Sequence, residues 1–188
     1  MTGDFTAFER TWLRGSFEFH CLSGSFARNS KRFETQAARI ARSVNACDYD
    51  LLGRQPKIPR LMGMRHASRE WTAFMVVEHL RLHTDFVFKA IQALLINNEA
   101  RAIVPDYRYL IPDDVGADCI DQFQDSVWQY VSFANNLVET RGYREPTGSI
   151  IHPLFGRLNV KRLHALASFH CRIHRPQIQK IIATEGVV

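Results

Sequence analysis

Apolar residues recur at intervals of three and four along four segments of the chain, which is the period of an amphipathic helix. The first predicted helix runs over about 25–46 and carries a basic outer face. The second runs over about 69–97, with Ser68 as its N-cap. The residues predicted along the inner side of this second helix are Trp71, Met75, His79, Leu82, Phe86, Ala90 and Ala93.

Two further helices follow. The third runs from Asp113, a plausible cap after a proline, to about Thr140, with Gly142 at its carboxyl end. The fourth begins after Asn159 as N-cap and lasts to about Thr184. Its predicted inner residues are Leu163, Leu166, His170, Ile173, His174, Gln177 and Ile181.

These segments predict an all-α protein, a four-helix bundle with long connections after the first and third helices. Gly and Pro residues interrupt the connection over 48–68, so it does not continue either helix. Residues 1–188 are expected to form a single domain, with 1–22 as an amino-terminal extension. Its pattern leaves open a short helix or an extended segment over 16–21, and no other segment reads as a strand.

Composition and charge narrow the class of protein. The 188 residues are 46% hydrophobic, and 24 basic against 19 acidic residues give a dispersed charge of +5. No signal-peptide pattern appears, and the longest uncharged run, thirteen residues, is too short to span a bilayer. The four cysteines form no CxxC pair. A soluble cytoplasmic protein is expected, without a membrane partner, and the scattered arginines of the first helix argue against nucleic acid.

The candidate chemistry lies in histidines on predicted inner faces. His170 and His174 are four residues apart on one helix, so both imidazoles can reach one ion. His79 is the only other histidine on a predicted inner stripe, and three neutral imidazoles suit a divalent transition metal such as Zn or Ni. Such a set leaves a coordination position open. The alternative is that these histidines are buried core residues bonded to carbonyl groups.

Two neighbours on the second helix are candidates for supporting roles. His83 is expected further from the inner stripe, partly exposed or beside the ligands. Glu78 could be a ligand, a base or an orienting group, although the surface is its commoner place. His164 is expected outside the inner stripe. A carboxylate di-iron centre is rejected because no Glu-x-x-His pair lies on an inner face of two helices.

The blocks IPRLMGMRHASREWTAFMVVEHLRLH and HPLFGRLNVKRLHALASFHCRIHRPQI resemble the two signature regions of the DinB-like (DinB/YfiT) superfamily of metal-binding four-helix bundles. The resemblance extends from Ile58 to Ile178, with a weaker middle. It implies that Trp71 opens the second helix and that His79, His170 and His174 ligate the metal. Pro176, just after the last of these, departs from the pattern and is expected to kink the helix.

The resemblance also implies a class of chemistry. The superfamily includes transferases that use a low-molecular-weight thiol, so the expectation is a metal-dependent enzyme of the thiol-transferase or hydrolase kind. Glu78 or His83 is the candidate proton acceptor, and Cys171 is not favoured as nucleophile. The expected partner is a small-molecule substrate or thiol, and a homodimer is left open. The alternative function is a non-catalytic metal-binding or interaction protein in which the ion braces the bundle.

Overall fold

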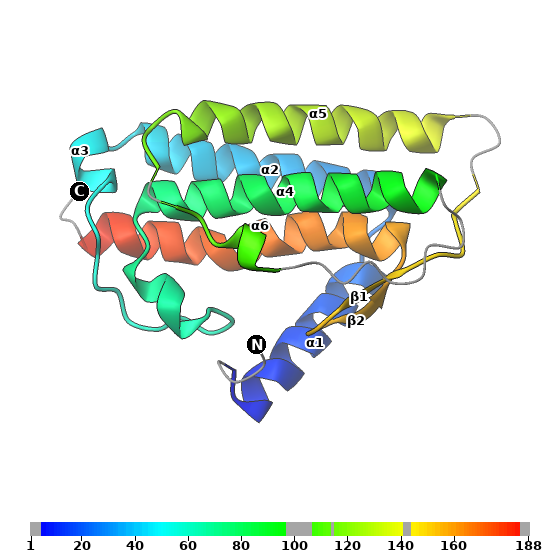
Figure 1. The fold of residues 1–188 in the computed structure, drawn as a ribbon, viewed down its shortest axis with the longest axis horizontal. Coiled ribbons are helices and arrows are strands. Elements are labelled where there is room, and N and C mark those ends of the chain that lie inside the picture. Colours follow the sequence, from blue (N-terminus) through cyan, green and yellow to red (C-terminus); the bar gives the residue numbers. More distant parts are fainter. Residues whose placement is uncertain (1–4, 97–106, 114, 141–143, 185–188) are drawn as a thin grey trace.

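Helices dominate the computed structural model, which describes residues 5–96, 107–113, 115–140 and 144–184 (Figure 1). The α-helices are α1 (Ala7–Leu22), α2 (Phe26–Asn45), α3 (Tyr49–Leu52), α4 (Ala73–Ile96), α5 (Cys119–Glu139) and α6 (Val160–Thr184). Two 3-10 helices, η1 (His66–Glu70) and η2 (Tyr107–Leu110), and two strands, β1 (Ile150–His152) and β2 (Gly156–Leu158), complete the described elements.

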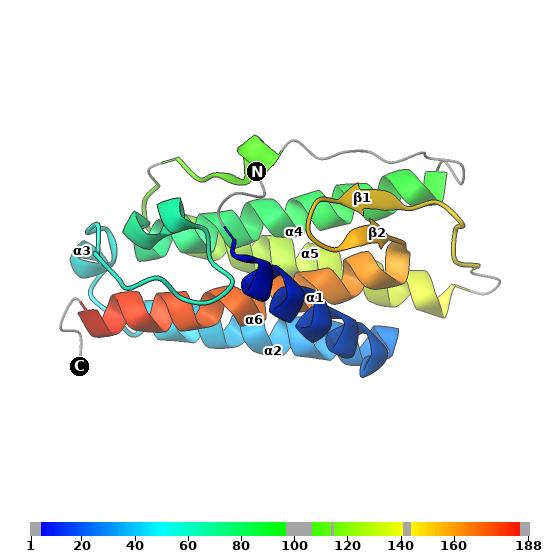
Figure 2. The same ribbon diagram turned by 90° about the horizontal axis from the view of Figure 1, so that it is seen from below.

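The four long helices α2, α4, α5 and α6 lie side by side (Figures 1 and 2). α4 and α5 run in one direction and α2 and α6 in the other. Each of the four packs against two others: α4 touches α5 and α6, and α2 touches the same two helices. The core between them is apolar and includes the fully buried Phe33, Leu80, Phe123, Tyr130 and Phe169. The predicted all-α class agrees with this arrangement.

Side chains cap two of the long helices: the cap at Asn159 was predicted, whereas Ser25 was predicted only as the approximate start of the first helix. The Ser25 hydroxyl accepts a hydrogen bond from the backbone N–H of Arg28 at 3.2 Å, and α2 begins at the next residue. The Asn159 side chain likewise accepts from the N–H of Arg162 at 3.0 Å at the start of α6. Each side chain satisfies one N–H group that has no partner within its helix. α6 then continues through Pro176 to Thr184.

The start of the second long helix was predicted wrongly. Residues 66–70 form the 3-10 helix η1, Trp71 is extended, and α4 begins only at Ala73. Thr72 provides the cap, because its hydroxyl accepts from the N–H of Met75 at 3.1 Å. Ser68 instead donates its hydroxyl to the Arg65 carbonyl. Ser and Thr at four-residue spacing offered two caps, and the later one begins the helix.

The third long helix also begins later than predicted. α5 starts at Cys119 with Asp118 at its cap, not after Asp113, so the connection from α4 is long as well. Gly116 precedes this start, and its carbonyl accepts from the Cys119 N–H at 3.3 Å in a turn. The predicted roles of Asn97 and Gly142 at helix ends fall outside the residues that the structure describes.

The amino-terminal segment is a helix, which resolves the alternative that its sequence left open. Thr6 and Glu9 form a capping box at the start of α1, in which each side chain bonds the other residue's backbone N–H. A strand pair was not predicted, yet β1 and β2 form a short antiparallel hairpin, with Ile150 opposite Leu158. β2 begins at Gly156, directly after the turn, and Gly156 has a φ of +70°, in the left-handed region that glycine tolerates best.

These smaller elements gather on one side of the four long helices. α1, the hairpin and the segment before α4 all lie across the face formed by α4 and α6 (Figure 2). Phe17 of α1, Phe155 of the hairpin turn and Phe169 of α6 pack ring against ring, with centroids 4.4 to 5.9 Å apart. This face is therefore covered by protein, and it contains the predicted histidines. Among the described helices, none has an apolar stretch sufficient to cross a membrane.

Gly63 allows the segment before α4 to pack closely against α1. Gly63 has a φ of +86°, and a Cβ atom there would lie 3.0 Å from Leu13 Cδ2 on α1. We therefore expect Gly63→Ala to lower the free energy of unfolding by about 1–2 kcal/mol. Gly15→Ala is the matched control: Gly15 lies inside α1 with no atom within 4 Å of its added methyl group. It should raise stability by about 0.5–1 kcal/mol. Urea denaturation of both variants measures this, and an unchanged midpoint for Gly63→Ala would contradict the packing argument.

Candidate metal centre

Three histidines from two helices meet on the covered face. His79 comes from α4, and His170 and His174 come from successive turns of α6. One nitrogen of each ring lies within 4.8 Å of those of the other two. His79 and His174 are buried and His170 is partly exposed. The structure thus brings together the three histidines that the sequence predicted, and their arrangement can hold a metal ion.

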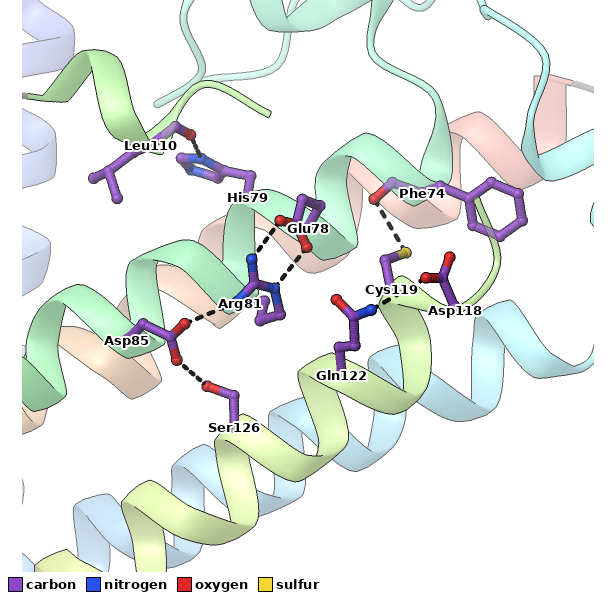
Figure 3. Close-up of polar contacts among 10 residues, drawn as sticks. All are labelled: Phe74, Glu78, His79, Arg81, Asp85, Leu110, Asp118, Cys119, Gln122 and Ser126. Atoms are coloured by element: carbon purple, nitrogen blue, oxygen red, sulfur yellow. Dashed lines mark hydrogen bonds and ion pairs between the residues drawn. The ribbon is translucent and has the colours of Figure 1, made fainter. Parts of the chain in front are cut away.

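The outer nitrogen of His79 is fixed by the backbone. His79 Nδ1 lies 2.6 Å from the carbonyl oxygen of Leu110, the last residue of η2 (Figure 3). A carbonyl only accepts, so Nδ1–H donates and the Nε2 lone pair of the neutral ring points to His170, whose Nε2 lies 2.8 Å away. A hydrogen bond of this kind, at the ring nitrogen that does not face the ion, orients a metal-binding imidazole and selects its tautomer.

His174 is oriented in the same way through a side chain. Its Nδ1 lies 2.8 Å from Gln177 Oε1, and Gln177 Nε2 donates to the Ser68 carbonyl at 2.7 Å. The second bond fixes which end of the amide faces the ring, so His174 Nδ1–H donates and Nε2 is available as a ligand. Gln177 was predicted on the inner face, but its role depends on η1, which the sequence did not indicate.

Burial keeps these imidazoles neutral. It lowers the pKa of His79 to about 3, with a further contribution from the charge of His174, and lowers the pKa of His174 to about 4. Burial and the neighbouring histidines also hold the pKa of His170 well below its usual range. Neutral nitrogen donors are the form that binds a transition metal, so the site needs no deprotonation near pH 7.

His83 lies closer to the centre than predicted. It is buried, and its ring stacks on that of His170 with centroids 3.7 Å apart and planes 8° from parallel. The inner stripe predicted for this helix did not include His83. Because α5, α6 and the loop elements all cover α4, more of the helix surface is buried than that single stripe. Burial, followed by the charge of His79, holds the pKa of His83 well below its usual range.

Glu78 points to a different surface of α4. Its carboxylate accepts two hydrogen bonds from Arg81, at 2.6 and 2.7 Å, and Arg81 also donates to Asp85 (Figure 3). Asp85 in turn accepts from Ser126 of α5 at 2.6 Å, so the chain of bonds joins α4 to α5. The structure does not bring Glu78 among the residues that line the histidine site.

A cavity of about 170 Å³ opens beside the three histidines. Its wall is mainly apolar and comes from α1, the segment before α4, η2, the hairpin and α6. Trp71 lies in this wall with its ring centroid 5.1 Å from that of His79. A small molecule in the cavity would therefore touch the candidate metal ligands directly.

His152 is a site residue that sequence reasoning did not identify. It lines the cavity, and its Nδ1 accepts the backbone N–H groups of Leu154 and Phe155 at 3.1 and 3.2 Å. Those bonds fix the hairpin turn and leave the proton of the neutral ring on Nε2. Burial lowers its pKa to about 4. Its position in the quoted HPLFG loop was the available signal, but only the hairpin brings it to the cavity.

His164 was predicted outside the inner stripe, and this prediction was wrong. It is fully buried on the side of α6 that faces α2 and α5. Its Nδ1 lies 2.7 Å from the Tyr130 hydroxyl, and Nε2 lies 3.0 Å from the Phe26 carbonyl. Its ring also stacks on Phe26 at 3.8 Å. The histidines of α6 thus lie on two sides of the helix: His164 lies in the core, and His170 and His174 line the cavity.

No cysteine is among the described residues that line the cavity. All four are free thiols, and Cys171 is buried, which raises its pKa far above the usual range. The same cause raises the pKa of Cys119 to about 12. A thiol with a raised pKa holds little of the nucleophilic thiolate at pH 7. Comparison with protein families, with curated proteins and with solved structures found no match.

Removing any one of the three histidines should abolish tight metal binding. His79→Ala, His170→Ala and His174→Ala are each expected to weaken affinity by more than about 100-fold, since even loss of an orienting group costs 10–100-fold. His164→Ala is the matched control, because it removes a buried imidazole from the other side of the same helix. Competition with a chromophoric chelator measures affinity. Loss of binding in Glu78→Ala or His83→Ala with full binding in His79→Ala would show the ligand assignment on α4 to be wrong.

The buried His164 also predicts a pH dependence of stability. Burial lowers its pKa to about 4 in the folded protein, against 6.5 for an ordinary histidine. Between these values the unfolded chain binds the proton and the folded chain does not, so stability falls as the pH drops from 6.5 to 4. His164→Gln should reduce this slope by up to about 1.4 kcal/mol per pH unit.

Urea denaturation of chelator-treated protein at several pH values measures this slope. The other histidines are common to both proteins and cancel in the comparison. His66→Gln, a change at an exposed histidine, serves as the control. An equal slope in wild type and His164→Gln would contradict the lowered pKa, because it would mean that His164 binds its proton equally in the folded and unfolded states.

Proposed function

We propose that this chain is a metal-dependent enzyme of the thiol-transferase or hydrolase kind, with one divalent ion, Zn or Ni, held by His79, His170 and His174. The observation that carries the proposal is the convergence of three ring nitrogens within 4.8 Å beside an apolar cavity. A purely structural site is normally closed by four protein ligands, whereas three protein ligands facing a cavity leave a position for substrate.

The same proposal includes the fold family. Four long helices packed around a common core, with one candidate ligand histidine on the second and two on the fourth, support a DinB-like four-helix bundle. Trp71 next to His79 supports it further, although Trp71 precedes α4 and does not open it. The hairpin and α1 cover the site.

A bound divalent ion supplies the means to form a thiolate or hydroxide near neutral pH, because it lowers the pKa of a coordinated thiol or water. The chain's own residues then bind and orient the substrate. Trp71 and the neighbouring apolar wall exclude water, and the Leu110 carbonyl and Gln177 hold two rings in place. His83 is better situated than Glu78 to accept a hydrogen bond from the substrate, because it lines the cavity and Glu78 is bonded to Arg81.

The second candidate function is a non-catalytic protein in which the ion braces the helices. It is favoured by the position of the cluster, which joins α4 to α6 and, through Leu110 and Ser68, also holds η2 and η1. An ion there would connect four segments that are distant in sequence. In that case chelation should lower the melting temperature strongly while added thiols or substrates leave the ion unaffected.

The distinguishing experiment is a titration of the cobalt- or nickel-substituted protein with a panel of small thiols. The enzymatic proposal predicts a new thiolate-to-metal charge-transfer band with at least one thiol and, with it, conjugation of that thiol to an electrophile. His170→Ala, which lacks one ligand, should show no band. If no thiol changes the spectrum while the ion still exchanges water, hydrolysis becomes the better assignment; a coordinatively saturated ion would contradict the enzymatic proposal.

A further inference from the structure

The outer side of α1 is apolar although it is exposed. Its large side chains there are Phe8, Trp12, Phe19 and Leu22, with exposed fractions of 68%, 43%, 70% and 86%. The intervals of four, seven and three residues between them place all four on one side of the helix. Single exposed apolar residues are common on protein surfaces, whereas a continuous apolar stripe marks an interaction site. We call these four residues the α1 stripe.

The other side of α1 is fixed to the rest of the protein. Leu13 and Phe17 are buried there. At the amino end of the helix, the Glu9 carboxylate accepts hydrogen bonds from the Thr6 backbone N–H and from Arg60, both at 2.8 Å. α1 is therefore an ordered helix within a single chain. A partner would meet a preformed surface, so association would cost little conformational entropy.

Gly15 lies at the centre of the α1 stripe. Phe8 and Leu22 are each seven residues from it, and Trp12 and Phe19 are three and four residues from it. If two α1 helices cross antiparallel at Gly15, Phe8 faces Leu22 of the partner subunit. In the same arrangement Trp12 faces Phe19 of the partner subunit. The stripe is thus complementary to itself, which a two-fold symmetric interface requires.

The glycine itself suits a crossing point between two helices. In the described part of the chain, no atom outside its own helix lies within 4 Å of the position that a Cβ at Gly15 would take. The distance between two packed helices depends on the side chains at their contact, so a glycine there lets the axes approach closely. Binding to a membrane surface would need neither the glycine nor large residues placed symmetrically about it. These features therefore favour a second α1 helix as the partner.

The area of the α1 stripe is sufficient for a dimer. A large aromatic side chain buries about 150–250 Å² when it is fully covered, so the stripe, at its exposed fractions, offers roughly 500 Å² per copy. Two copies would bury roughly 1,000 Å² from these side chains alone, which is about the lower limit for a specific interface.

The charges beside the stripe do not oppose this pairing. Arg14 donates to the Leu154 carbonyl at 2.7 Å. Glu18 accepts two hydrogen bonds from Arg162, at 2.5 and 2.8 Å. Both charges thus have partners within their own chain, and because they are of opposite sign, two copies of this flank do not repel each other.

We propose that two copies of this chain form a dimer through α1, with the two helices antiparallel and crossing at Gly15. The interface consists of Phe8, Trp12, Phe19 and Leu22 from each copy. This inference goes beyond the proposed function, because it concerns a different surface and requires no metal. Since α1 also contributes to the wall of the cavity, the dimer would hold that part of the wall in place.

Sedimentation equilibrium of the full chain tests the dimer. One chain has a mass of 21.7 kDa, and we expect wild type to reach twice this mass when concentrated and to dissociate on dilution. An interface near the lower size limit is weak, so the dimer should predominate at about 200 µM. Phe19→Glu places a charge in the interface and should weaken association at least about tenfold.

Trp128→Glu is the matched control. Trp128 is 71% exposed, as Phe19 is 70% exposed, but it lies on α5, on the opposite side of the four long helices from α1 (Figure 1). The control should therefore associate as wild type does. Far-UV circular dichroism and urea denaturation show that each variant is folded. If Phe19→Glu does not fold, Leu22→Ser replaces it at the most exposed position of the stripe.

Gly15→Leu tests the crossing geometry. Within one chain the added side chain points into open space, and leucine favours a helix more than glycine does, so the variant should be at least as stable as wild type. Between two chains the same side chain would keep the helices apart. Association should therefore weaken at least about tenfold, as in Phe19→Glu.

Three results would overturn the inference. One is a wild type that remains monomeric at about 200 µM. Another is a dimer that Phe19→Glu and Gly15→Leu both leave intact. The third is a monomeric wild type that binds phosphatidylcholine–phosphatidylglycerol vesicles and loses this binding in Phe19→Glu, because the stripe would then be a membrane-binding surface. A dimer that persists in excess chelator would support the inference whether or not the protein binds metal as proposed.

Discussion

The contact between His79 on α4 and His170 on α6 is the interaction on which the rest of the site depends. Two antiparallel helices bring uncharged imidazole rings together, with their Nε2 atoms 2.8 Å apart, in a region where a charged ring would be strongly disfavoured. The arrangement is stable because the outer nitrogens of His79 and His174 donate to a carbonyl and an amide oxygen. Those partners come from η2 and α6, and the amide is held in turn by the segment that contains η1.

This dependence explains why the covering elements matter. α1 and the hairpin add Phe17, Ile150 and Leu158 to the apolar core. Together with η1 and η2 they enclose the cavity, and η1 and η2 orient two of the three candidate ligands. They also supply much of the apolar wall of the cavity, and His152. A common helical framework can therefore serve different substrates through changes in these segments alone.

The sequence predicted the long helices and the placement of the three histidines on inner faces, because both follow from the helical period of the apolar residues. Apolar residues at three-to-four spacing define a face, and His170 and His174 lie on that face of one helix. The N-cap was predicted correctly at Asn159, where one good candidate preceded the helix, and wrongly at Ser68, where Thr72 was a competing candidate.

What the sequence could not predict depends on contacts between distant segments. His164 and His83 appeared peripheral because a helical wheel assumes one buried side, whereas α6 packs against α2, α4 and α1, and α4 packs against α5, α6 and η2. The bond from His79 to Leu110 and the bond from Gln177 to Ser68 span 31 and 109 residues, and no local pattern encodes either. The hairpin was missed because strands of three residues are too short to show alternation.

The most direct test of the central claim is X-ray absorption spectroscopy of the zinc-loaded protein. The account predicts a zinc shell of three imidazole nitrogens at about 2.0–2.1 Å, with at least one further light-atom ligand from solvent. The outer-shell scattering of three imidazole rings should be present in wild type and reduced to two in His174→Ala. A shell that contains sulfur, or fewer than three imidazoles in wild type, would contradict the assignment of His79, His170 and His174 as the metal ligands.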